Sequence, residues 1–278
     1  MTFISKHEER DSELPKEREK LLDNIQNDLF EDDNILAFFY GGSIGNETTD
    51  LFSDIDLRVV VKPDKINEYV LNKKNHAENW GKVLYFEDLN PSSIYIVAHY
   101  DSFIKVDIFY YTPEYIQPSV WLKNIKILKD TDGMLTNILE QSLNHTYEPT
   151  LDEFEFWRTK FFAHLHEAYR RTLRKEYYYA LDCIDKLRLS IVTAWYMESG
   201  MQPNSFGDWA KYEGNRSSLK DWQKSLLESW ECKRDTVEIM NVMRSIVFEF
   251  KEVHRSLCNT VGVKEDPEWV NRIINSVL

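Results

Sequence analysis

The sequence lacks the features that mark membrane proteins and disulfide-rich secreted proteins. No run of about 18 apolar residues occurs, so we expect no membrane-spanning helix. The start of the chain is charged where a signal peptide has its apolar region, and we therefore expect a cytoplasmic protein. The cysteines, Cys183, Cys232 and Cys258, are odd in number and lack CxxC spacing. They predict buried thiols rather than a disulfide framework or a zinc site.

Basic residues are also scarce relative to acidic ones. Lysine and arginine total 34 against 47 aspartate and glutamate residues, which gives a formal net charge of -13. Binding to a nucleic-acid backbone draws on clustered Lys and Arg, so a nucleic-acid strand is not an expected partner. The 42% hydrophobic and 14% aromatic content is typical of a globular protein with a substantial core. A small or cationic partner suits this charge better.

The first half of the chain predicts a mixture of helices and strands. An amphipathic helix is predicted over about residues 15–30, and the residues before it are charged enough to be loose. Short segments rich in β-branched and aromatic residues then predict a sheet. The predicted strands are residues 35–40, 55–61, 83–86, 94–100, 104–111 and 125–128, and further helices are predicted at 64–75 and 133–144.

The second half of the chain changes to a helical period. Apolar residues recur at steps of three and four from Phe154 to Ala168, and the same spacing returns over residues 181–195 and 240–257. This pattern predicts a bundle of helices.

The change of period falls near a proline at position 149, so we divide the chain into residues 1–148 and 149–278. The predicted fold class is α+β. A mixed sheet flanked by helices is expected first, followed by an all-α helical bundle.

A glycine turn follows the first predicted strand. Gly41 and Gly42 let the backbone turn sharply and let a ligand approach it closely. If a short helix begins at Ser43, its free N–H groups and the Ser43 hydroxyl would face an anion such as a polyphosphate. Taken alone, the same residues more often form an ordinary turn or helix cap. They match neither the P-loop nor the GxGxxG pattern.

Two aspartates open the next strand. Because side chains alternate along a strand, Asp54 and Asp56 point to one face. A solvated sheet face is the ordinary explanation, whereas a Mg²⁺ ion would neutralise the repulsion between the carboxylates if a third ligand were present. Asp107, in the apolar strand 104–111, is the candidate. If the two strands are neighbours in register, Asp107 lies about 5 Å from the pair, and a metal would remove its desolvation cost.

Together these residues resemble the signature of the polymerase-β-like nucleotidyltransferase superfamily. The signature comprises Gly42-Ser43, ten intervening residues, Asp54-Ile55-Asp56-Leu57 and a later strand aspartate, Asp107. The order of elements is similar across about residues 16–111. The helical second half resembles the enzymes that adenylylate antibiotics, such as the aminoglycoside and lincosamide nucleotidyltransferases.

The resemblance implies a role for each matching residue. Gly42 and Ser43 would hold the distal phosphates of ATP or another NTP, and Asp54 and Asp56 would coordinate Mg²⁺. Asp107 would complete the metal site and act as, or beside, the base that deprotonates the acceptor hydroxyl. Attack on the α-phosphate would then expel pyrophosphate. Residues 1–148 would form the nucleotidyltransferase domain, and 149–278 a helical domain for the substrate or a partner.

Several alternatives stay open at this point. The acceptor is either a small molecule, such as an aminoglycoside, or a protein, as in antitoxin-like AMP transferases, and a non-catalytic nucleotide-sensing module is a third hypothesis. A second chain in a homodimer could complete the site. Asp182 and Asp185 either line an acceptor pocket or lie on a solvated helix face. The candidate partners of the triphosphate, which the sequence does not rank, are Arg58, Lys105, Lys186 and Arg188.

Overall fold

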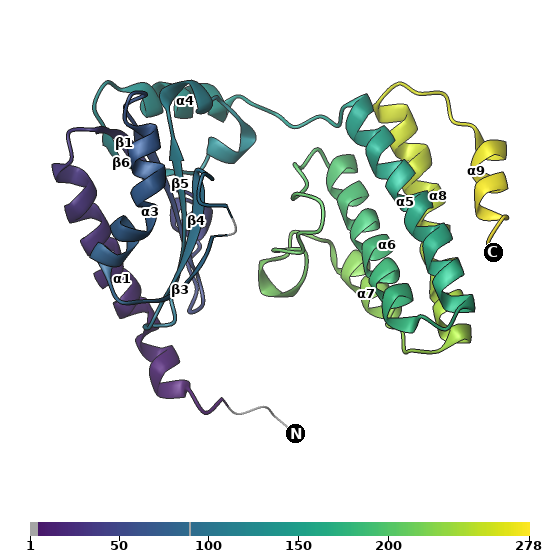
Figure 1. Ribbon diagram of the computed structural model, residues 1–278. Helices are drawn as coiled ribbons and strands as arrows, with labels where there is room; N and C mark the ends of the chain where they lie inside the picture. The colour runs from purple at the N-terminus through teal and green to yellow at the C-terminus, as the bar shows by residue number, and fades with distance from the viewer. Residues whose placement is uncertain (1–4, 89) are drawn as a thin grey trace. The chain divides into compact units, whose positions relative to one another are not determined.

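The computed structural model describes residues 5–88 and 90–278 of the chain. Contacts between residues divide it into two compact units, Met1–His145 and Thr146–Leu278. Among the described residues, strands occur only in the first unit, and the second is built of helices (Figure 1). The structure therefore has the predicted α+β class. No helix within the described ranges is long and apolar enough to cross a lipid bilayer.

The first unit is built on a six-stranded mixed sheet. The strand order is β3-β4-β5-β2-β1-β6. Strands β2 and β5 pair in parallel, and the other neighbours in this order pair antiparallel. Because β2 and β5 run in the same direction, their first residues lie at the same edge of the sheet. The strands are β1 Ile35–Tyr40, β2 Ile55–Val61, β3 Val83–Glu87, β4 Tyr95–Tyr100, β5 Lys105–Tyr111 and β6 Lys126–Asp130.

Helices pack on both faces of this sheet. Apolar side chains of α1 (Glu8–Glu31) and α3 (Ile66–Trp80) join those of one sheet face in a single buried cluster. On the opposite face, α4 (Met134–Leu143) packs against side chains of β1 and β2 in a second, smaller cluster. The short helix α2 (Gly42–Gly45) and the 3₁₀ turns Pro113–Tyr115 and Val120–Leu122 connect the strands.

Helix α1 begins earlier than the sequence predicts. Residues from Glu8 onward are helical, so the expectation that the residues before Pro15 are loose is wrong for this segment, while residues 1–4 lie outside the described part. A proline inside a helix removes one hydrogen bond. Leu14 offsets this loss, because its side chain is 3% exposed and packs in the core of the first unit.

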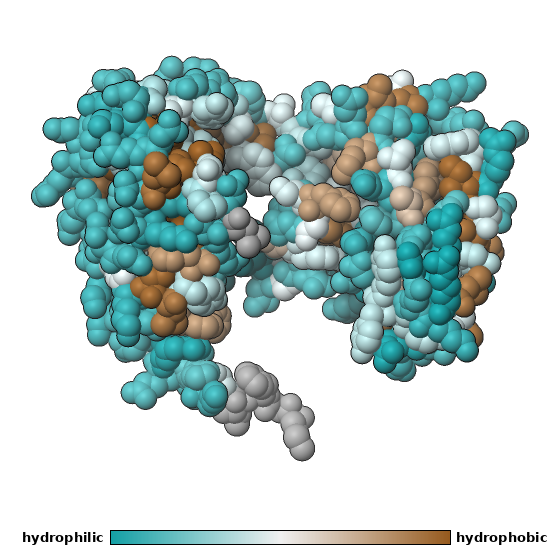
Figure 2. Space-filling model, viewed as in Figure 1, coloured by the Kyte–Doolittle hydropathy of each residue, from teal (hydrophilic) through white to brown (hydrophobic). Residues whose placement is uncertain are grey.

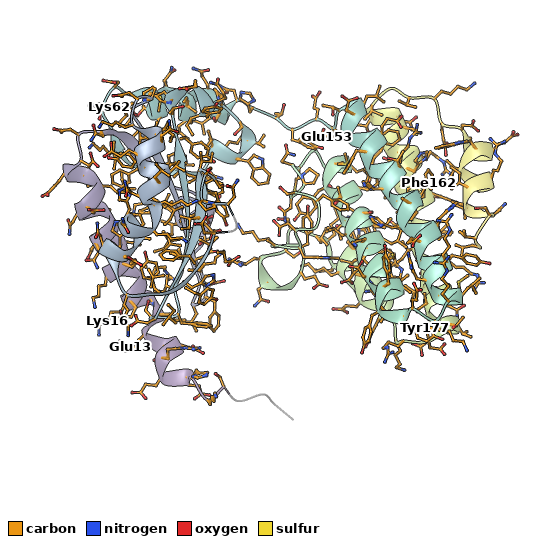
Figure 3. All side chains as sticks on the ribbon, in the orientation of Figure 1. Glu13, Lys16, Lys62, Glu153, Phe162 and Tyr177 are labelled. Atoms are coloured by element: carbon orange, nitrogen blue, oxygen red, sulfur yellow. The ribbon has the colours of Figure 1, made fainter. Side chains whose placement is uncertain are left out.

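The second unit is a helical bundle. Its helices are α5 Leu151–Leu173, α6 Tyr177–Glu198, α7 Asp221–Ser229, α8 Thr236–Thr260 and α9 Pro267–Ile274. Helix α5 opens with a capping box in which the Thr150 and Glu153 side chains bond to each other's backbone N–H groups. Glu153 is labelled at the start of this helix in Figure 3. In the core, the rings of Phe161 and Phe250 stack with centroids 3.8 Å apart. The face shown in Figure 2 is largely hydrophilic with scattered apolar patches.

Candidate active site

The glycine turn and the second aspartate of β2 are packed together. Gly41, directly after β1, donates its N–H to the backbone oxygen of Asp56 at 2.9 Å. Gly42 has a φ of +53°, and an ideal Cβ at this position would lie 1.8 Å from Oδ2 of Asp56. A side chain at position 42 therefore has no room while the Asp56 carboxylate keeps its place.

The parallel pairing brings the third aspartate to the first two. Asp56 of β2 is the register partner of Asp107 of β5. The alternation expected in both strands is present, since Ile55, Leu57, Val106 and Ile108 are fully buried under α1 and α3. Asp56 and Asp107 lie on the opposite face and are only partly exposed. The condition on which the sequence analysis placed Asp107 beside the pair is thus met.

A lysine lies between two of the carboxylates. Nζ of Lys105 is 2.9 Å from Oδ2 of Asp54, and it is 3.2 Å from each carboxylate oxygen of Asp107. One ammonium group therefore forms ion pairs with both Asp54 and Asp107. Among the four candidate partners of the triphosphate named from the sequence, Lys105 is the one whose charge lies between the aspartates.

Arg58 sits at the edge of the same group. Its guanidinium is 3.8 Å from Oδ1 of Asp56 and stacks over the ring of Phe109, 4.1 Å from the centroid. Because the stacked ring holds the guanidinium in one place, Arg58 is fixed more firmly than the flexible Lys105.

Burial and neighbouring charges act on the ionisation of this group. Burial raises the pKa of Asp107; Lys105 opposes this rise, and the nearby carboxylates of Asp56 and Asp54 add to it. For Lys105, burial alone would lower the pKa, but its contacts with Asp54 and Asp107 hold the pKa above its usual value. The ammonium is consequently charged at neutral pH.

The donor set suits a hard divalent cation. Three carboxylates supply oxygen ligands of the kind that Mg²⁺ prefers. Oδ1 of Asp107 is buried and accepts no hydrogen bond of normal geometry, and the hydroxyl of Ser43 is buried and lacks a partner among the described residues. In that part of the chain, however, no three His, Cys, Asp or Glu side chains are grouped closely enough to hold an ion. The carboxylates fit a metal only after their side chains adjust.

The acidic residues proposed in the helical unit lie in local ion pairs. Asp182 is 2.5 Å from Lys186, and Asp185 is 2.8 Å from Arg188, all on α6. Both aspartates are exposed, as expected of a solvated helix face. Lys186 and Arg188, two of the candidate triphosphate partners, therefore form ion pairs within their own helix.

The sequence analysis missed a hollow on the second unit. It has a volume of about 460 Å³ and combines residues from α6, α7 and the loop between them. Its lining includes Asp185, Trp209, Glu213, Glu228 and Glu231. The sequence pointed only to Asp185 as a candidate pocket residue, because the other carboxylates join it only when α6 and α7 pack.

Comparisons with known proteins identify relatives of the whole chain. A family model described as streptomycin adenylyltransferase matches residues 16–275. Among solved structures, an aminoglycoside 6-adenyltransferase from Bacillus subtilis has 14% sequence identity and a TM-score of 0.44, covering 93% of this chain and 96% of that one. A nucleotidyltransferase-like protein from Exiguobacterium sibiricum 255-15 has 13% identity and a TM-score of 0.44, covering 88% and 77%. A search of curated proteins found no match.

Proposed function

The chain belongs to the streptomycin adenylyltransferase family of enzymes, and from this premise we propose that it transfers AMP from ATP to a hydroxyl group of an aminoglycoside antibiotic. The observation that carries the proposal is the pairing of Asp56 with Asp107 beside the Gly42 turn. Spacing in the sequence suggested this grouping, and the register of two separate strands supports it.

Asp54, Asp56 and Asp107 would hold Mg²⁺ in this proposal. When bound, the ion would neutralise charge on the triphosphate and favour departure of pyrophosphate. Asp107 has a second role as the acceptor of the proton from the antibiotic hydroxyl. Its carboxylate, paired in register with Asp56, would lie at the metal site where the hydroxyl attacks.

Gly42 and Ser43 would bind the distal phosphates. The Ser43 hydroxyl is buried and has no partner among the residues that the structure describes, so a phosphate oxygen would satisfy it. The missing side chain at Gly42 leaves the backbone open to close approach.

The acidic character of the chain favours a cationic acceptor. A net charge of -13 attracts polycations over a distance, and the hollow on the helical unit is lined by four carboxylates against one cation, Arg188. Aminoglycosides carry several ammonium groups and match this charge.

The test is pyrophosphate release from each NTP in the presence of Mg²⁺. The acceptor panel contains streptomycin, other aminoglycosides and a lincosamide, and the Asp54→Ala/Asp56→Ala double variant is the control. We expect release with ATP and one class of aminoglycoside, an antibiotic heavier by one AMP, and no product from the variant. If ATP binds and no antibiotic triggers release, the small-molecule acceptor is wrong. Incubating a cell lysate with labelled ATP would then test a protein acceptor.

A further inference from the structure

Lys105 occupies a position that a bound metal would need. Its ammonium is in contact with Asp54 and with both carboxylate oxygens of Asp107, as described above. A cation shared by these two acids would bind to the same oxygens. Mg²⁺ binds carboxylate oxygens at only about 2.1 Å, so an ion bridging Asp54 and Asp107 would lie where the ammonium now lies, and the two cations cannot occupy that place together.

The position of Lys105 also stabilises the metal-free site. Three partly buried carboxylates at one edge of the sheet repel one another. A single ammonium between two of them relieves the repulsion. The side-chain exposures of Lys105 and Asp54 are 36% and 38%, so the ammonium can leave without crossing the core.

We propose that Lys105 is an exchangeable counter-ion of the aspartate cluster: it balances the carboxylates before metal binds, and on metal binding it moves to the triphosphate. The inference rests on the proposed metal site. A lysine suits this exchange because its charge sits at the end of a flexible four-carbon chain and it binds phosphate as a point charge. Arg58, fixed on the Phe109 ring, does not have this freedom.

The exchange predicts effects of opposite sign when the lysine is removed. In Lys105→Met the carboxylates have no internal competitor, so Mn²⁺ alone should bind about tenfold more tightly. The triphosphate loses a cationic partner, so an ATP analogue with a methylene bridge between its α- and β-phosphates should bind about tenfold more weakly at saturating Mn²⁺. A residue with a purely structural role would weaken both.

Free Mn²⁺ measured by electron paramagnetic resonance gives the first affinity, and calorimetry with the analogue gives the second. Lys82→Met is the matched control, because it removes the same charge from an exposed pair with Asp101 and should change neither. Lys105→Arg keeps the charge and should restore most of the competition with Mn²⁺.

The outcomes separate this inference from the proposed function. If the wild-type protein binds Mn²⁺ and Lys105→Met binds it equally or more weakly, Lys105 does not compete with the metal for the carboxylates. Tighter Mn²⁺ binding with unchanged affinity for the analogue overturns the transfer to the triphosphate. Absence of Mn²⁺ binding by the wild-type protein overturns the metal site itself, and with it both proposals.

Discussion

The carboxylate of Asp56 occupies the space that a side chain at position 42 would fill, with Oδ2 only 1.8 Å from an ideal Cβ on Gly42. Glycine is thus required here for two reasons, the close contact and the φ of +53°. Several other glycines also have a positive φ, but the close contact with Asp56 connects this turn directly to the proposed metal ligands.

We predict that Gly42→Ala abolishes adenylyl transfer because the new methyl group displaces Asp56. Gly133→Ala is the matched control, since Gly133 has a φ of +70° with nothing within 4 Å of an ideal Cβ. The control should lose only about 1 kcal/mol of stability and keep its activity. Pyrophosphate release and thermal unfolding of both variants check this. Equal activities would show that Asp56 can move without consequence.

Asp107→Asn should lower the rate of AMP transfer at least about 100-fold, because the amide can neither accept the hydroxyl proton nor bind a metal as well. The fold should survive, as asparagine has the same shape. Asp101→Asn, in the turn before the same strand, removes an exposed charge that pairs with Lys82 and should leave the rate unchanged. Similar rates for the two variants would remove Asp107 from the chemistry.

Lys73→Met should destabilise the first unit far more than Lys74→Met. Both lysines pair with Asp88, at 2.8 Å and 3.1 Å, but Lys73 is 2% exposed and Lys74 is 49% exposed. Removing one partner of a buried pair costs about 3 kcal/mol, while an exposed pair contributes less than about 1 kcal/mol. Urea unfolding of the two variants measures the difference. Comparable losses would mean that the burial of Lys73 carries no energetic weight.

The stability of the helical unit should fall as the pH drops below neutrality because of His254. This side chain is 1% exposed among the rings of Phe154, Trp157 and Phe250, and burial, with help from Arg158, lowers its pKa from 6.5 to about 4. Between these values the unfolded chain binds more protons than the folded one, so folding weakens as pH falls.

The loss due to His254 should reach roughly 3 kcal/mol at pH 4. Melting temperatures recorded from pH 7 to pH 4 should decline less steeply in His254→Gln than in the wild-type protein. The exposed His145 provides the control, and His145→Gln should follow the wild-type curve. If the His254→Gln curve is as steep as that of the wild type, other groups control the acid response.

The sequence predicted the strands and the aspartates more fully than it predicted their surroundings. Alternation of polar and apolar residues is a local property, so it placed Asp56 and Asp107 on the correct faces of β2 and β5. The register between those strands depends on how the intervening helix and hairpin pack, and it could be stated only as a condition. The position of Lys105 depends on its rotamer and on two acids from different strands. No spacing rule could rank it above Arg58.

At the start of α1, tertiary packing outweighed the local preference of proline for the first turn of a helix. Proline predicts a helix start, yet the buried Leu14 before it extends the helix to Glu8. Packing of Leu14 against strands that are far away in the sequence therefore set the first residue of α1, which the local sequence placed at Pro15.

The parallel pairing of β2 with β5 also bears on the order in which the chain folds. Parallel neighbours cannot be joined by a tight turn, so α3, β3 and β4 must find their places before Asp56 and Asp107 can meet. Contacts between distant segments form slowly, whereas helices such as α5 and α6, which follow each other directly, associate quickly. During synthesis the sheet unit emerges first, yet we expect it to complete its fold more slowly than the helical unit. We therefore expect the aspartate cluster to form late in folding, and conditions that trap the unit early should yield a compact protein in which Asp56 and Asp107 are not paired.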